Sequence, residues 1–212
     1  MRPQMNESYG QAFVHTPNLD SLARGGVVFD RAYVQVAWCS PSRNSFLTGR
    51  TPDTLQIWDF GKNFRHYPEN PPTNHTGTGP DLTVIPLPQW FKLHGFLTLG
   101  GGKVYHPDQP PDNDVPYSWS TDVGVPYFDF VHQDCPHNVT KIGCGGCPQD
   151  LPDAHFYDWQ LANATVHHLR FAKADGRPFF VAAGFRRLHL FSWIEGSDTA
   201  APDIGVADIL IE

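Results

Sequence analysis

The sequence predicts an α/β domain in which a mostly parallel central sheet is flanked by helices. Two observations predict this class: helical segments alternate with short apolar strands along the chain, and the composition is that of a globular protein. Of the 212 residues, 40% are hydrophobic and 17% are charged, which is too apolar for a disordered chain. The 19 glycines and 20 prolines indicate a loop-rich domain rather than a helical bundle.

The first predicted unit leads to a cysteine. A helix is expected to begin with Thr16 as its cap and to end at the glycines 25–26. Most of the residues 27–36 are β-branched, aromatic or small, which predicts an extended, largely buried strand that delivers the chain to Cys39. A second helix is expected over 40–48, because a proline occupies its first turn and a glycine follows its end.

Two further units follow the same order of helix and strand. The spacing of apolar residues predicts a helix over 86–94, followed by a strand over 96–99. The strongest helical pattern runs over 153–174, and an apolar strand is expected over 179–184. The apolar face of the long helix is expected to hold Phe156, Trp159, Ala162, Val166 and Leu169.

Two stretches between these units are crowded with Pro, Gly, Asn and His. Residues 63–81 and 107–142 are therefore predicted to be long surface loops, a class that is usually functional or insertional. Residues 192–212 do not continue the pattern of helices and strands. We expect a partial catalytic domain over 1–191 and a divergent C-terminal tail over 192–212.

Charge and hydropathy exclude some classes of partner. With 15 Lys and Arg against 22 Asp and Glu, the net charge is −7, so binding to a nucleic-acid backbone is not expected. The longest apolar runs are shorter than the ~20 residues of a membrane span. The N-terminus carries no apolar stretch, and no signal peptide is predicted in this chain.

Other features favour a secretory protein. Glycosylation sequons are one of them, although accidental sequons in a cytosolic chain are the alternative. A cluster of cysteines in a stretch rich in Pro and Gly is the other, and it fits either a disulfide or a zinc site built on a Cys-x-x-Cys knuckle. The sequons lie at Asn6, Asn74, Asn138 and Asn163, the clustered cysteines are Cys135, Cys144 and Cys147, and the zinc alternative would add His132 or His137.

Cys39 and Arg43 are the first candidates for chemistry. A cysteine at a helix N-terminus lies where backbone N–H groups and the helix dipole favour negative charge. Arg43 follows one turn later and would add a fixed positive charge on the same face. The pair predicts an anion-binding turn with a nucleophile, while a buried structural cysteine is the simpler alternative.

The spacing around Cys39 resembles a family signature. The pattern Cys-x-Pro-Ser-Arg-x-x-x-Leu-Thr-Gly over 39–49 is similar to the signature of the type I sulfatases, which have an alkaline-phosphatase-like fold. In that family the cysteine is oxidised to formylglycine, and the hydrated aldehyde is the nucleophile. The resemblance implies this conversion at Cys39 by a formylglycine-generating enzyme, and a role for Arg43 in holding the aldehyde hydrate.

Two more segments resemble the same family. Residues 102–106, Gly-Lys-Val-Tyr-His, look like the second sulfatase signature, which implies that Lys103 and His106 face the sulfate. A solvated lysine and a loop histidine are the alternatives. Residues 179–189 are similar to the strand and loop that supply a further substrate histidine, here His189. Leu188 departs from the family, which usually has proline before this histidine.

Within the family, residues 2–191 resemble the iduronate-2-sulfatase subgroup. That resemblance implies a sulfated glycan or other sulfate ester as substrate, a lysosomal or secreted location, and a disulfide between Cys135 and Cys147, with Cys144 left over. It also implies a Ca²⁺ ion, for which Cys39 is the one expected ligand with a counterpart here. The paired aspartates before Arg2 and a later Asp-His-Gly have none.

Two classes of function follow from these matches. One is a sulfuric ester hydrolase of which this chain is the N-terminal part, expected to be inactive alone because most calcium ligands lie outside it. The other is a truncated, non-catalytic product that at most binds sulfated glycans. Relatives that act on phosphonates or phosphodiesters are a weaker third class. The division of acid and base roles between His106 and His189 stays open.

Overall fold

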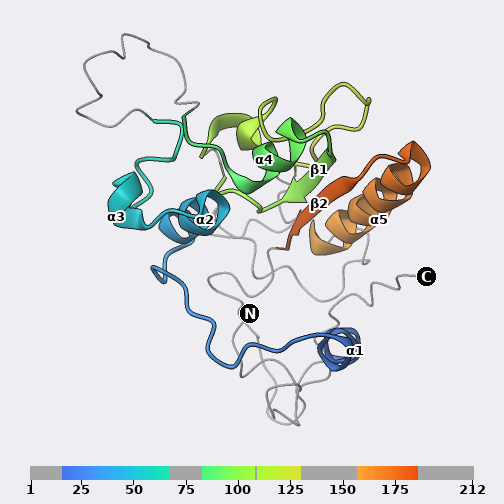
Figure 1. Cartoon of the computed structure of the whole chain (residues 1–212), viewed down its shortest axis with the longest axis horizontal. Coiled ribbons are helices and arrows are strands. Elements are labelled where there is room, and N and C mark those ends of the chain that lie inside the picture. Colours follow the sequence, from blue (N-terminus) through green and yellow to red (C-terminus); the bar gives the residue numbers. More distant parts are fainter. Residues whose placement is uncertain (1–15, 67–82, 108, 130–156, 186–212) are drawn as a thin grey trace, which may run out of the picture. The chain divides into compact units, whose positions relative to one another are not determined.

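The computed structural model describes residues 16–66, 83–107, 109–129 and 157–185. The chain divides into two compact units, which are described separately. One unit consists of Met1–Tyr33, His132–Ala162 and Arg186–Glu212, and the other of Val34–Val131 and Asn163–Phe185. The second unit contains the sheet and most of the described helices (Figure 1).

Two parallel strands form the described sheet. β1 (Leu97–Gly102) pairs with β2 (Phe179–Gly184) in a register that sets Leu97 opposite Phe179 and Gly102 opposite Gly184. Their parallel direction confirms the α/β prediction for this part of the chain. β2 has the predicted bounds, and β1 extends beyond the expected 96–99 because Gly100–Gly102 continue the pairing.

Helix α5 (Tyr157–Asp175) covers one face of the sheet. Leu97 and Leu99 of β1 point to this face, and they form a buried cluster with Ala172 of α5. Val181 of β2 packs against the same cluster. Alternate residues of a strand point to opposite faces, so these apolar positions seal the sheet under α5.

Helix α4 (Leu87–Leu93) covers the opposite face. Its Phe91 ring stacks on Phe180 of β2, with 4.8 Å between the ring centroids. Phe180 also packs against a second cluster on this face, which includes Tyr105 and Trp119. The sheet therefore lies between α4 and α5 in a three-layer α/β arrangement, as Figure 1 shows.

Two further helices, α2 and α3, come before α4 in the chain. α2 (Cys39–Thr48) ends at Gly49, whose φ of 67° gives the left-handed cap expected of a C-terminal glycine. α3 (Pro52–Leu55) is capped by Thr51, whose hydroxyl accepts a hydrogen bond from the Thr54 N–H at 3.2 Å. The helix predicted over 40–48 is thus confirmed, with Cys39 as its first residue.

Helix α1 (Pro17–Gly25) confirms the first predicted helix in the other unit. Its cap differs from the expectation, since the Thr16 hydroxyl makes no hydrogen bond to a backbone N–H. It donates instead to the Asp20 carboxylate at 3.0 Å. A side chain one turn on therefore competes with the backbone for the threonine hydroxyl.

The strand predicted over 27–36 is wrong. These residues are turns and irregular backbone, and the side chains of Val27 and Tyr33 are 79% and 84% exposed. A strand needs a neighbour for its backbone N–H and C=O groups, and among the described residues only β1 and β2 pair as strands. Strand propensity depends on such context, so apolar, β-branched residues alone do not make a strand.

The buried face of α5 is also shifted from the predicted one. The buried positions are Leu161, Ala162, Thr165, His168 and Ala172, while Trp159 is 41% exposed. Their helical spacing is correct for one face, but the face includes a threonine and a histidine. Of the predicted positions, Ala162 is buried, Val166 and Leu169 are half-buried, and Phe156 lies outside the described residues. The apolar pattern along the helix therefore predicted the buried face only in part.

The two stretches predicted to be surface loops are partly exposed and partly buried where the structure describes them. Asn63, Phe64 and Arg65 are buried in the first stretch. In the second, Asp114 at the end of the 3-10 turn η3 (Pro111–Asp114) and Trp119 are buried as well. These segments form part of the core around the site.

Candidate active site

Cys39 opens helix α2 and is half-buried there. It directly follows Trp38, the extended N-cap residue, which makes no capping hydrogen bond through its side chain. The first-turn N–H groups of a helix have no partners within the helix. Cys39 therefore lies where the backbone favours an anion, as the sequence predicted.

Arg43, one turn along α2, joins this helix to the residues after β1. Its Nη1 donates hydrogen bonds to the carbonyl oxygens of Lys103 and Val104, the latter at 2.9 Å. Its Nε is buried and has no hydrogen-bond partner among the described residues. Burial lowers the pKa of Arg43, and the nearby Cys39 thiol partly opposes that shift. The structure thus brings the two sequence motifs together.

Lys103 is placed by the end of the sheet. Its backbone N–H donates to the Gly184 carbonyl at 2.7 Å, which extends the pairing of β1 with β2 by one step. The residue is buried, and Gly102 before it has a φ of 74°. A β-carbon on Gly184 would lie 2.1 Å from the Lys103 carbonyl carbon, so only glycine allows this approach. Gly184 thus allows close packing of the two strands, and Gly102 supplies the left-handed backbone before Lys103.

His106 lies against an aromatic stack beside the cysteine. Its ring is tilted on Phe60, with centroids 5.1 Å apart, and Phe60 in turn stacks on Trp38 at 5.3 Å. The Nδ1 atom of His106 is 3.0 Å from the Pro107 carbonyl oxygen. Trp38 and Phe60 are half-exposed, so this edge of the site is apolar and open to solvent.

Gln109 is a residue near the site that sequence reasoning missed. Its backbone N–H donates to the His106 carbonyl at 2.9 Å, and its side-chain amide donates to the Phe60 carbonyl. The Ser40 hydroxyl of α2 donates to its Oε1 at 3.4 Å. Because it follows no periodic pattern, no signal in the sequence marks it.

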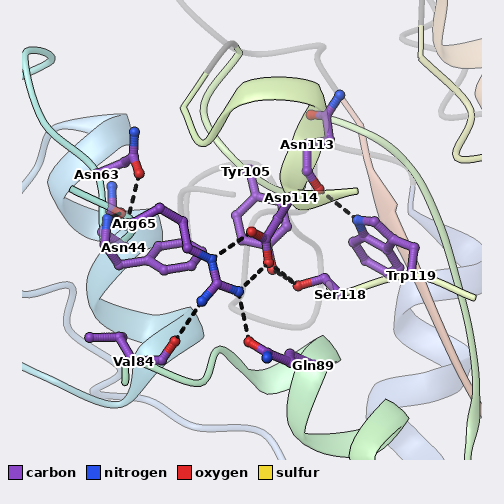
Figure 2. A network of polar contacts seen from close by, with 11 residues as sticks. Asn44, Asn63, Arg65, Val84, Gln89, Tyr105, Asn113, Asp114, Ser118 and Trp119 are labelled. Carbon is purple, nitrogen blue, oxygen red and sulfur yellow. Dashed lines mark hydrogen bonds and ion pairs between the residues drawn. The ribbon is translucent and has the colours of Figure 1, made fainter. Parts of the chain in front are cut away.

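A buried ion pair was also missed. Arg65 donates to both carboxylate oxygens of Asp114 at 2.7 Å, as Figure 2 shows. Its other hydrogen bonds reach the Val84 carbonyl and the Gln89 side chain of α4. Both partners came from stretches read as surface loops, where charged residues normally stay solvated.

Several predicted features lie outside the described residues. These are His189, the cysteines Cys135, Cys144 and Cys147 with His132 and His137, and the sequons at Asn6, Asn74 and Asn138. Asn163 is described, and it is exposed on α5. The pairing of the cysteines and the role of His189 therefore stay predictions.

The described residues do not form a calcium site by themselves. In the part of the chain that the structure describes, no three His, Cys, Asp or Glu side chains gather into a group that would hold a metal ion. Ca²⁺ takes 6–8 oxygen ligands, and Cys39 is the one expected ligand in this part. Within the same ranges, no helix has both the length and the apolar character needed to cross a bilayer.

Comparison with known proteins supports the resemblance. The family model described as Sulfatase matches residues 2–194. The chain is 34% identical over 202 residues to iduronate 2-sulfatase of Mus musculus, covering 90% of this chain and 33% of that protein. For the Homo sapiens protein the identity is 33%, with 90% and 34% covered. A sulfatase of Formosa agariphila is 28% identical over 190 residues, with 84% and 35% covered.

The chain thus spans about a third of the length of these relatives. The family match covers both motif segments that meet at Arg43, and the parallel sheet between α4 and α5 agrees with the alkaline-phosphatase-like fold of this family. On these grounds the chain belongs to the sulfatase family.

Proposed function

We propose that this chain carries the nucleophile and anion-binding part of a sulfuric ester hydrolase of the iduronate-2-sulfatase type. The observation that carries the proposal is the contact of Arg43 with the carbonyl oxygens of Lys103 and Val104. It joins the two motifs that resemble the sulfatase signatures, which lie 60 residues apart in the chain. The proposed substrate is a sulfated glycan or another sulfate ester.

The proposed nucleophile is formylglycine made from Cys39. As the first residue of α2, it lies next to N–H groups that favour negative charge. Arg43 is proposed to hold the aldehyde hydrate, because its buried Nε has no partner among the described residues and an arginine donor is strong toward an anionic oxygen.

Lys103, His106 and His189 are proposed to act on the sulfate. A sulfate ester is an anion that repels nucleophiles, so the Lys103 ammonium would neutralise charge on its oxygens. His106 would orient a hydroxyl of the aldehyde hydrate or take its proton, and His189 would contact or protonate the ester. Calcium is a family expectation to which the described residues give no complete site, and no step is assigned to it.

The test is the chemical state of Cys39. The chain would be produced together with a formylglycine-generating enzyme, and the peptide that contains Cys39 would be analysed by mass spectrometry. We expect the aldehyde in the wild type and none in a Cys39→Ser control. Unmodified thiol alone, from cells that convert another sulfatase, would contradict the proposal.

A second candidate is a non-catalytic protein that binds sulfated glycans. It is favoured by the lack of a metal-binding group among the described residues. An assay with an aryl sulfate and with a sulfated uronic acid, in the presence of Ca²⁺, separates the two. Turnover that disappears in Cys39→Ala supports the enzyme, whereas saturable binding of a sulfated oligosaccharide with no turnover and with unmodified Cys39 supports the second candidate.

A further inference from the structure

We infer that Asp114 is a positioning residue for the segment that carries Lys103 and His106. The inference rests on the proposed function of that segment, but it comes from different contacts. Asp114 and Arg65 form a buried ion pair in which the side chains are 1% and 5% exposed. The desolvation of a buried ion pair costs free energy, and the attraction between the two charges often only offsets that cost. Stability alone therefore does not explain the pair, and its hydrogen bonds to other residues indicate what it positions.

One set of contacts runs from Asp114 to the site segment. The Ser118 hydroxyl donates to Oδ2 of Asp114, and the Tyr105 hydroxyl is 2.7 Å from the Ser118 oxygen. Tyr105 is 1% exposed and lies in sequence between the two proposed substrate-binding residues. Its ring packs on Phe64 at 5.6 Å and on Trp119 at 6.2 Å. Tyr105 thus anchors the segment to Asp114 (Figure 2).

The direction of these hydrogen bonds is fixed by charge. Asp114, paired with Arg65, accepts a hydrogen bond from the Ser118 hydroxyl. Ser118 therefore has no hydroxyl hydrogen left to donate to Tyr105, and the tyrosine hydroxyl is the donor between these two residues. Burial, with the Asp114 charge as a smaller cause, raises the pKa of Tyr105 above its ordinary range. The phenol therefore keeps the proton that this arrangement requires, and the three groups have one arrangement rather than several.

A second set of contacts runs from Arg65 to helix α2. The Phe64 N–H donates to Oδ1 of Asn44 at 3.0 Å, and the Arg65 N–H donates to Oδ1 of Asn63 at 2.9 Å. Asn44 also donates to the Ser40 carbonyl at 2.8 Å, within the first turns of α2. The turn that carries Arg65 therefore contacts the helix that begins with Cys39, and the ion pair joins this turn to Asp114 and, through Ser118, to Tyr105.

The backbone that presents Asp114 is held in an uncommon conformation. Asp112, Asn113 and Asp114 have φ values of 51°, 53° and 65°, a left-handed region in which L-residues cost roughly 1–2 kcal/mol each and Asp and Asn somewhat less. The Asn113 carbonyl accepts a hydrogen bond from the Trp119 indole at 2.7 Å. Strain of this kind persists where surrounding contacts determine it, and it is common near functional sites.

The test uses the full chain with inorganic sulfate as the probe. Asp114→Asn keeps the shape of the side chain and removes its charge. Asp175→Asn is the matched control, since Asp175 pairs with Arg177 at the surface. Two readouts are taken on folded protein: the affinity for sulfate, and the ring resonances of His106 in a histidine-labelled NMR spectrum, assigned with His106→Gln.

We expect Asp114→Asn to weaken sulfate binding by about tenfold, equal to about 1.4 kcal/mol, and to shift the His106 resonances. The control should change neither readout. A folded Asp114→Asn protein with wild-type affinity and unshifted His106 resonances would overturn the inference. If the wild type binds no sulfate, the proposed function fails at this site, while the His106 resonances still decide the positioning role.

A second variant covers the case in which Asp114→Asn does not fold. Tyr105→Phe removes one hydroxyl and keeps the buried ring and the ion pair. We expect the same direction with a smaller effect, about threefold in sulfate affinity, because one neutral hydrogen bond is lost. If the His106 resonances do not shift in this variant, Asp114 has only a structural role in the fold and does not position His106.

Discussion

Two arginines close to the site are buried in different ways. Arg65 directs its donors to the Asp114 carboxylate, the Val84 carbonyl and the Gln89 side chain, and its guanidinium also lies 4.8 Å from the Phe64 ring centroid. Arg43 donates through Nη1 to two carbonyl oxygens, and its buried Nε has no hydrogen-bond partner among the described residues.

The difference separates a structural arginine from one with binding capacity. A buried guanidinium with a bidentate carboxylate needs no ligand, because its charge and its donors are satisfied. A buried donor without a partner is uncommon and costs free energy until something accepts from it. No hydrogen bond or ion pair described for Arg43 involves a carboxylate, and it lies one turn from Cys39. An anion at the start of α2 would supply what Arg43 lacks.

The largest expected effect is the loss of stability when Arg65, whose guanidinium nitrogens all donate to described acceptors, is replaced. Arg65→Met leaves the Asp114 carboxylate buried and unpaired, which should lower the free energy of unfolding by about 3–5 kcal/mol. Urea denaturation followed by tryptophan fluorescence measures this. Arg177→Met, at the exposed ion pair with Asp175, is the control and should leave the midpoint unchanged. A small effect of Arg65→Met would remove the contrast between the two arginines.

The next effect concerns the backbone that Arg43 contacts. Gly184→Ala would set a β-carbon 2.1 Å from the Lys103 carbonyl carbon, so the strands must separate at this point. We expect a loss of about 1–3 kcal/mol in unfolding free energy together with weaker sulfate binding. Gly25→Ala is a matched control, because nothing lies within 4 Å of its added carbon. A stability loss with unchanged sulfate affinity would show that the Lys103 backbone does not set the anion site.

Substitution of Arg43 should have the opposite profile to that of Arg65. Arg43→Met removes the hydrogen bonds to Lys103 and Val104 but also removes the unpartnered donor, so stability should change by only about 1 kcal/mol. Sulfate affinity, measured by calorimetry, should fall at least about tenfold, as for a lost charged hydrogen bond. Arg43→Lys should restore part of it. Wild-type affinity in Arg43→Met would contradict the proposed anion site.

The smallest expected effect concerns His168, a buried histidine of α5. Burial on α5, and to a lesser degree the neighbouring His167, lower the pKa of His168. The unfolded chain therefore binds this proton more readily, and the contribution of His168 to stability is full above the unfolded pKa of about 6.5 and falls as the pH drops from there through the folded pKa. His168→Gln should show a weaker loss of stability between about pH 7.5 and 5 in urea titrations. Parallel pH profiles of the two proteins would contradict this.

Local sequence signals correctly predicted the helices and strands whose ends are marked by residues within or next to them. Gly49 ends α2 in a left-handed cap, and β2 has the predicted bounds. The prediction of a strand over 27–36 was wrong because a strand also needs a neighbouring strand to pair with, which no local pattern specifies. The buried face of α5 was predicted only in part for a related reason, since His168 is buried by packing that its polarity does not predict.

The same distinction applies to the site. The motifs predicted Cys39, Arg43, Lys103 and His106, and the structure links the first motif to the second through Arg43. Asp114 could not be predicted because its importance depends on Arg65, which lies 49 residues away in sequence. Long-range polar pairs of this kind leave no periodic signal along the chain.

The burial of Trp119 makes this region observable in solution. Its indole is 1% exposed, donates to the Asn113 carbonyl, and has ring atoms 2.6 Å from where a β-carbon on Gly100 would lie. The other described tryptophans, Trp38, Trp58, Trp90 and Trp159, are 41% to 54% exposed. A small neutral quencher such as acrylamide will therefore quench the fluorescence of these exposed tryptophans first and that of Trp119 last. With Trp193, which lies outside the described residues, replaced by phenylalanine, the unquenched, blue-shifted fraction of the fluorescence then reports whether the Asp112–Asp114 turn is closed on the sheet.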